Sequence, residues 1–140
     1  MPNASKITTF SGSWINKRRW DWYGTLTFAD PVTREQALTR FKRWKIQLQK
    51  ATGILIQYIL VMETPENDGS PQINFLLSGA NSENPNKWEQ KWSRTNGEAR
   101  IMKYQPGQGA SHYIARQLAN ADAEVILGKG FRPTSKLTSN

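Results

Sequence analysis

Two short stretches of this sequence carry side chains whose types and spacing could do chemistry, and the first is ASHYIARQL. Tyr113 and Arg116 lie three residues apart in a segment predicted to be a helix over 110–120, so they share one helix face. A tyrosine can attack a polarised phosphate, and a cation one turn away can stabilise the phosphate or the phenolate. The same pair also fits a half-buried tyrosine beside a surface arginine, and these residues alone favour that alternative.

The second stretch is PQINFLLSG at 71–79. Its alternation of residue types predicts a strand that turns Gln72 and Asn74 to the same face of a sheet. Two neutral amides then project side by side, next to apolar residues. They are either ordinary polar residues on the solvent side of the sheet or part of a site that binds a ligand on that face.

The chain lacks the residues of several standard catalytic sites. It has no cysteine, which excludes disulfides, zinc–thiolate sites and cysteine nucleophiles. Its one histidine, His112, excludes any two-histidine metal motif. Ser111 beside it points about 100° away on a helix, so these two residues cannot form a triad. The loop QPGQG lacks the lysine and the hydroxyl residue of a phosphate-binding loop.

Length and hydropathy limit the architecture. The 140 residues predict one domain over 1–140, with poorly ordered tails at 1–13 and 129–140. No apolar run approaches the roughly 20 residues of a membrane span, and the first residues do not have the pattern of a signal peptide. We therefore expect a domain with no membrane partner and a cytoplasmic location.

Net charge is the most informative property of the composition. Nineteen Lys and Arg residues against eleven Asp and Glu residues give +8 at pH 7 and a pI of about 10.0. Each neutralised phosphate of a nucleic acid releases condensed counterions, so such a surplus favours a nucleic-acid partner. Tryptophans lie among these cations, where an exposed ring can stack on a base. The predicted nucleic-acid contacts are Arg18, Arg19, Trp20, Trp22, Arg40, Lys42 and Arg43.

Hydrophobic periodicity predicts the element order β-α-β-β-α-β-α. The predicted strands are 24–28, 54–63, 71–79 and 98–104, and the predicted helices are 33–51, a short helix around KWEQKW, and 110–120. The strand 54–63 is almost continuously apolar, which is typical of a strand buried on both faces and central in its sheet.

The helix over 33–51 has recognisable ends and a core stripe. Thr33 and Gln36 fit a capping box, although Asp30 followed by a proline is an alternative start. Gly53 is a suitable C-terminal stop. Trp44 falls on the apolar stripe and is predicted to be core, as is one of the two tryptophans of KWEQKW.

These elements predict an α+β fold. One central antiparallel sheet with helices packed on one side satisfies the order, in the manner of ferredoxin-like or RRM-like folds. Such a sheet leaves its other face available to a ligand. The residues predicted on that face are Thr25, Thr27, Gln72 and Asn74.

In their order and spacing, these segments resemble the HUH-type replication initiators (Rep proteins) of rolling-circle plasmids and phages, over roughly residues 14–135. GTLTF followed by DPVTREQALTRFKRW is similar to the first motif of that family and the helix after it. YILVMETPENDGSPQINFLLSG is similar to the second block, which usually ends in a His-hydrophobe-His strand. WEQKW and NGEARIMKYQPGQGASHYIARQL resemble the third block, in which a tyrosine precedes a lysine by three positions. GKGFRPTSK is similar to the tail that often follows.

The resemblance implies a central antiparallel sheet flanked by helices, single-stranded origin DNA as substrate, and other replication proteins as partners. In that family a tyrosine attacks a phosphodiester and keeps the 5′ end as a phosphotyrosine, while a Mg or Mn ion polarises the phosphate. Carried over by position, Tyr113 is the nucleophile, Arg116 stands where lysine is usual, and Glu63 is the acidic metal ligand. Gln72 and Asn74 occupy the two histidine positions.

The replacement of both histidines by amides changes the chemistry expected of that site. Amide oxygens are weaker donors to Mn than imidazole nitrogens, whereas Mg and Ca accept them. One hypothesis is a DNA-binding domain that recognises single-stranded or hairpin origin DNA and has degenerate nicking activity. The alternative is an active metal-dependent tyrosine nickase. A third hypothesis is an interaction module that binds no nucleic acid.

Overall fold

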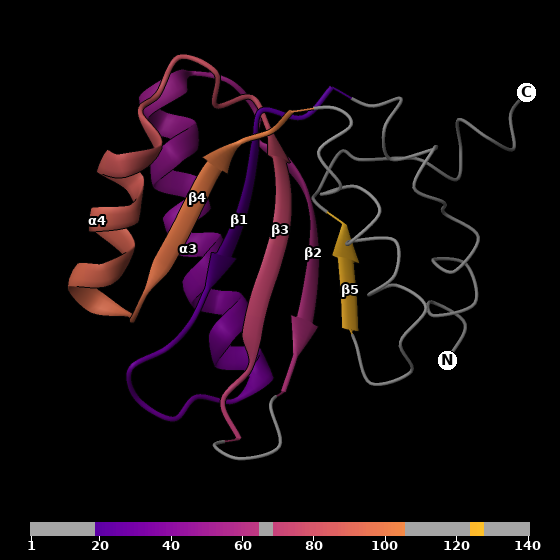
Figure 1. Cartoon of the computed structure of the whole chain (residues 1–140), viewed down its shortest axis with the longest axis vertical. Coiled ribbons are helices and arrows are strands. Elements are labelled where there is room, and N and C mark those ends of the chain that lie inside the picture. The colour runs from indigo at the N-terminus through magenta and orange to yellow at the C-terminus, as the bar shows by residue number, and fades with distance from the viewer. Residues whose placement is uncertain (1–18, 65–68, 106–123, 128–140) are drawn as a thin grey trace, which may run out of the picture.

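The computed structural model describes residues 19–64, 69–105 and 124–127 (Figure 1). Its elements are β1 (Trp22–Leu26), α3 (Arg34–Thr52), β2 (Gln57–Glu63), β3 (Gln72–Ser78), α4 (Pro85–Thr95), β4 (Ala99–Lys103) and β5 (Glu124–Leu127). The five strands form one antiparallel sheet in the order β4-β1-β3-β2-β5, which confirms the predicted α+β class. The helix predicted over 110–120 and the tails predicted at 1–13 and 129–140 lie outside the described residues.

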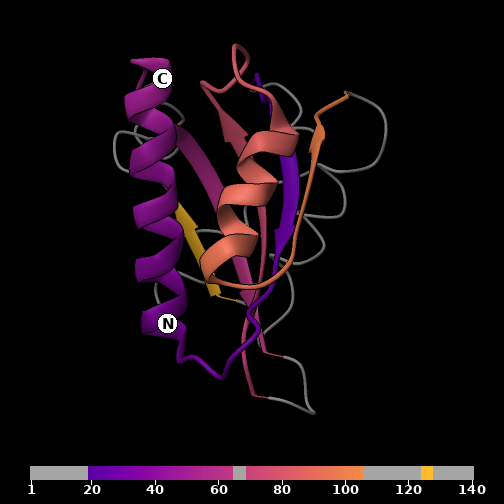
Figure 2. The same cartoon turned by 90° about the vertical axis from the view of Figure 1, so that its left-hand side faces the viewer.

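Both described helices pack on the same face of the sheet (Figure 2). Strands turn alternate residues to opposite faces, and Leu26, Leu60 and Phe75 on this face share one core with apolar residues of α3 and α4. The predicted helix layer on one side of the sheet is therefore confirmed for these two helices. In the described parts of the chain, no helix is long and apolar enough to cross a membrane.

The ends of α3 follow from local side-chain chemistry. The Gln36 backbone N–H donates to Thr33 Oγ1 over 3.0 Å, and the Thr33 N–H donates to Gln36 Oε1 over 2.9 Å, so the predicted capping box is present. Gly53 ends the helix with φ 72°, a left-handed conformation that glycine adopts without a Cβ clash. The alternative start at Asp30 is wrong.

The first strand lies two residues earlier than the predicted range of 24–28. Gly24 lies at the centre of this strand. A larger residue would not fit there, because its Cβ would lie 2.5 Å from the Phe75 ring. The strand ends at Leu26, since the next carbonyl, of Thr27, accepts a hydrogen bond from the Trp92 indole instead of from a strand. Thr27 lies one residue beyond the strand, where its hydroxyl accepts a hydrogen bond from the Glu98 N–H over 3.2 Å.

The strand β2 lies inside the sheet, between β3 and β5, and is not its middle strand; β3 pairs with it over the whole of Gln57–Glu63. The strand β2 begins three residues later than predicted. Ile54 and Leu55 before it are about half exposed and lie outside the sheet. On its other side β2 pairs with β5. The strand β5, with the sequence EVIL, was not among the predicted strands, and its pairing partner lies more than 60 residues earlier in the chain.

The capping box provides a test of how α3 is stabilised. We expect Thr33→Ala to lower the free energy of unfolding by about 1 kcal/mol, because it leaves a helix N–H without its partner. Thr39→Ala, at an exposed position inside the same helix, is the matched control and should leave stability unchanged or slightly raised. Urea denaturation of both variants measures the difference. Equal effects of the two substitutions would contradict the capping role.

Candidate functional site

The structure brings together the three residues predicted to hold a metal. Glu63 of β2 lies directly opposite Gln72 of β3, and Asn74 lies two residues further along β3, between Thr25 and Val61. All of them belong to the sheet face that points away from α3 and α4, because their strand neighbours supply the core. The register of β2 and β3 therefore produces the juxtaposition that the resemblance implied.

The centre of this sheet face is closed by buried side chains, so the prediction that the face is available to a ligand is wrong for its centre. Ile59, Val61 and Leu76 are fully buried although they point away from the helix layer. Asn74 is also buried, with 1% of its surface exposed. The ends of the face are more accessible, since Glu63 and Gln72 are partly exposed and Arg100 and Met102 of the edge strand β4 are exposed.

Asn74 has one satisfied and one unsatisfied amide atom. The Thr25 hydroxyl donates to Asn74 Oδ1 over 2.9 Å. The Nδ2 group of Asn74 is buried and has no hydrogen-bond acceptor in the described part of the chain. Reversing the amide would exchange the two atoms and still leave one of them buried without a partner. Such an arrangement costs about 1–3 kcal/mol, and buried orphan groups of this kind concentrate at binding sites.

These residues do not fit a Mg or Mn ion. Glu63 is the one carboxylate among them, and burial raises the pKa of Glu63, which disfavours its charged form. The oxygen of Asn74 is engaged by Thr25. Within residues 19–64, 69–105 and 124–127, no three side chains of His, Cys, Asp or Glu lie together in a position to share a metal ion. One carboxylate and one free amide oxygen are a small fraction of the six or more oxygens that such ions take.

Three of the predicted site residues are not placed by the structure. Tyr113, Arg116 and Arg18 lie outside the described residues. The roles given to Tyr113 and Arg116 as nucleophile and supporting cation stay predictions.

The base-stacking role predicted for Trp20 and Trp22 is wrong. Stacking needs an exposed ring, but these side chains are 6% and 1% exposed. The strand β1 turns Trp22 towards the helix layer, where it joins the core. Arg19 beside them is exposed and stays available for a phosphate contact.

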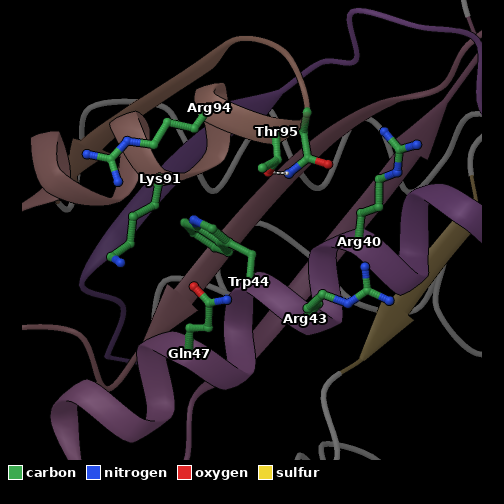
Figure 3. Close-up of a pocket in the computed structure, with 8 residues that line it drawn as sticks. Arg40, Arg43, Trp44, Gln47, Lys91, Arg94 and Thr95 are labelled. Atoms are coloured by element: carbon green, nitrogen blue, oxygen red, sulfur yellow. Dashed lines mark hydrogen bonds between the residues drawn. The ribbon is translucent and has the colours of Figure 1, made fainter.

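A basic groove of about 460 Å³ runs between α3 and α4 (Figure 3). Two cations of α3 and two of α4 line it on either side of the Trp44 ring, together with neutral polar side chains and no carboxylate. The lining residues are Arg40, Arg43, Trp44, Gln47, Lys91, Arg94, Thr95 and Asn96.

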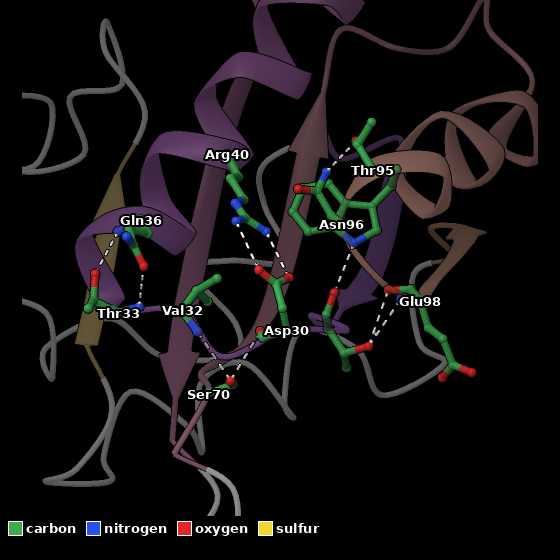
Figure 4. A network of polar contacts seen from close by, with 11 residues as sticks. Asp30, Val32, Thr33, Gln36, Arg40, Ser70, Thr95, Asn96 and Glu98 are labelled. Carbon is green, nitrogen blue, oxygen red and sulfur yellow. Dashed lines mark hydrogen bonds and ion pairs between the residues drawn. The ribbon is translucent and has the colours of Figure 1, made fainter.

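Of the three α3 cations predicted to contact nucleic acid, Arg40 is held in place and the other two are exposed. The two terminal guanidinium nitrogens of Arg40, Nη1 and Nη2, donate to the Asp30 carboxylate over 3.2 and 3.3 Å (Figure 4). This bidentate bond also lowers the pKa of Asp30. Lys42 and Arg43 are exposed, and no carboxylate of the described residues pairs with them.

The α4 half of the groove was missed by the sequence analysis. Lys91 and Arg94 lie three residues apart and so share a helix face, a signal that was present in KWEQKWSR. The two tryptophans of that segment drew attention to stacking or core packing instead. Both Trp88 and Trp92 are buried, where only one was predicted to be.

Charge is concentrated in the helix layer as a whole. The two helices carry nine Lys and Arg residues and two Glu residues, a net +7, while the full chain carries +8. Because both helices lie on one face of the sheet, the described part of the molecule presents most of its positive charge in one direction.

Comparison with known proteins finds no match for this chain among family models, curated proteins or solved structures. The likeness to rolling-circle initiators therefore rests on the order and spacing of the segments alone.

The poor donor set at Glu63 predicts that divalent ions do not stabilise the protein. An ion that binds the folded state raises the melting temperature by mass action. We expect millimolar Mg or Mn to shift the melting temperature of the native protein and of Glu63→Gln equally, within the error of thermal unfolding measurements. A shift in the native protein that Glu63→Gln abolishes would show that the site binds metal.

Proposed function

We propose that this chain is a DNA-binding domain of the rolling-circle initiator type, which binds single-stranded or hairpin DNA and cleaves it poorly or not at all. The observation that carries the proposal is the net +7 of the helix layer, presented from one face of the sheet. A surface of this kind attracts phosphates from solution, and its affinity comes from counterion release.

The arrangement of the elements is consistent with this function. The described chain runs β-α-β-β-α-β before the last strand, with strand order β4-β1-β3-β2. That order is the one expected of a split βαβ, ferredoxin-like domain, a fold that hosts many nucleic-acid-binding modules. Fold alone does not set function, so the charge distribution remains the stronger support.

Weak cleavage is supported by the chemistry around Glu63. Loss of a metal removes the Lewis acid that stabilises charge on the phosphate, and this stabilisation is commonly worth several kcal/mol of barrier. Gln72 and Asn74 supply no imidazole, and the Asn74 Oδ1 atom already accepts a hydrogen bond from the Thr25 hydroxyl. The alternative, an active tyrosine nickase, needs a metal held in some other way.

DNA binding predicts a steep dependence of affinity on salt. For single strands the slope of log K against log salt is about −0.7 for each phosphate neutralised, so contact with several phosphates should give a slope steeper than about −2. A fluorescence anisotropy titration of a labelled oligonucleotide between 50 and 300 mM salt, roughly the range over which such slopes are resolved, measures it. Absence of binding to single-stranded and hairpin DNA at low salt would rule out the proposal.

The cleavage half of the proposal is tested separately. We expect no covalent protein–DNA adduct when the protein is incubated with single-stranded or hairpin oligonucleotides and Mg or Mn, as judged by denaturing gel electrophoresis. An adduct that forms in the native protein and disappears in Tyr113→Phe would establish the nickase alternative. Binding with no adduct supports the non-cleaving domain.

A further inference from the structure

We propose that the groove between α3 and α4 binds the sugar–phosphate backbone of a single DNA strand, as a contact region separate from the Glu63 site. The proposal rests on the DNA-binding function proposed above and assigns the place of contact. Glu63, Gln72 and Asn74 lie on the sheet face that points away from the helices, whereas the groove lies within the helix layer. A strand in the groove therefore lies on the other side of the sheet from Glu63, Gln72 and Asn74.

The cations of the groove are available for phosphates. Arg43, Lys91 and Arg94 have no carboxylate partner in the described part of the chain, although Lys91 lies 5.4 Å from the centre of the Trp88 ring. Arg40 is the exception, since the Asp30 carboxylate already accepts a hydrogen bond from each of its two terminal guanidinium nitrogens. Three cations from two helices are thus left to face one groove without internal neutralisation.

The polar residues beside these cations suit a phosphodiester as well. Gln47 is exposed on α3, and the Asn96 amide donates to Thr95 Oγ1 over 3.1 Å at the end of α4 (Figure 3). Neutral amides and hydroxyls of this kind commonly add hydrogen bonds to phosphate and sugar oxygens. They extend the site along a backbone without adding charge.

The floor of the groove offers no ring on which a base could stack. Trp44 lines it, but only 4% of this side chain is exposed, and its indole N–H is bonded to the Trp88 carbonyl over 3.1 Å. A ring in this position offers no stacking surface. The site therefore binds the backbone and leaves the bases outside, and we expect binding there to be independent of sequence.

A pair of matched double variants tests the assignment. Arg43→Gln/Arg94→Gln removes two cations from opposite sides of the groove, and Arg100→Gln/Lys103→Gln removes two exposed cations of β4 that do not line it. Both lower the net charge by the same amount. Circular dichroism and thermal unfolding check that each variant is folded.

The probe is an oligothymidylate of about 12 nucleotides, within the length that a single-strand site covers. We expect the groove variant to lose about tenfold or more in affinity near 100 mM salt and to lower the salt slope by about 1.4, the value for two phosphate contacts. The control variant should lose less than about threefold, because its two exposed cations do not line the groove and salt screens their effect on a strand bound there. A mixed-sequence oligonucleotide of the same length should give the same results.

The remaining outcomes decide against the assignment. Equal losses of affinity in both variants would mean that binding depends on net charge alone and that the groove holds no strand. Native binding with no loss in the groove variant would place the DNA elsewhere and leave the proposed function intact. A native protein that binds no DNA would overturn the proposed function itself.

Discussion

The side chain of Trp44 fixes how the two helices are placed, and the rest of the helix layer depends on it. Its indole Nε1 donates to the Trp88 carbonyl of α4 in a buried hydrogen bond. Its ring also lies edge-on to Trp88 and Trp92, with centroids 6.2 and 6.1 Å away, and packs at 5.8 Å against Phe75 of β3. One residue of α3 therefore holds both α4 and the central strand. Removing a buried aromatic of this kind typically costs about 3–5 kcal/mol.

This packing gives the groove between α3 and α4 a rigid floor and side walls of adaptable side chains. The Trp44 ring is fixed by its contacts, while the long cationic side chains beside it lie at the surface and can adjust to a ligand. A site built in this way suits a repeating, flexible partner such as a nucleic-acid backbone. The opposite sheet face is built differently, because Asn74 is buried and has a single hydrogen bond to Thr25 there.

Much of the fold could be predicted because its signals are local. The capping box at Thr33, the stop at Gly53 and the limits of β3 each depend on a few neighbouring residues. The shift of β1 could not be predicted in the same way, since it depends on Phe75 filling the space beside Gly24. The pairing of β5 with β2 joins segments more than 60 residues apart, and four apolar residues do not specify such a partner.

The candidate site was only partly predictable. Adjacency of Glu63 and Gln72 was implied by the resemblance, but the bond between Thr25 and Asn74 depends on the register of two strands. Clusters of cations and tryptophans in the sequence do not reveal which side chains are buried, and so Trp20 and Trp22 were assigned wrongly to the surface. The groove requires α3 and α4 to be packed together before its two halves meet.

Nuclear magnetic resonance tests most directly whether a DNA strand lies along the helix layer. In a ¹⁵N-labelled sample titrated with oligothymidylate, we expect the largest shift changes at the side-chain amide of Gln47 and at the backbone amides of Arg94 and Thr95. Amides of Thr25, Gln72 and Asn74, on the opposite face, should change little. Changes confined to that sheet face, with the Gln47, Arg94 and Thr95 signals unmoved, would contradict binding in the groove.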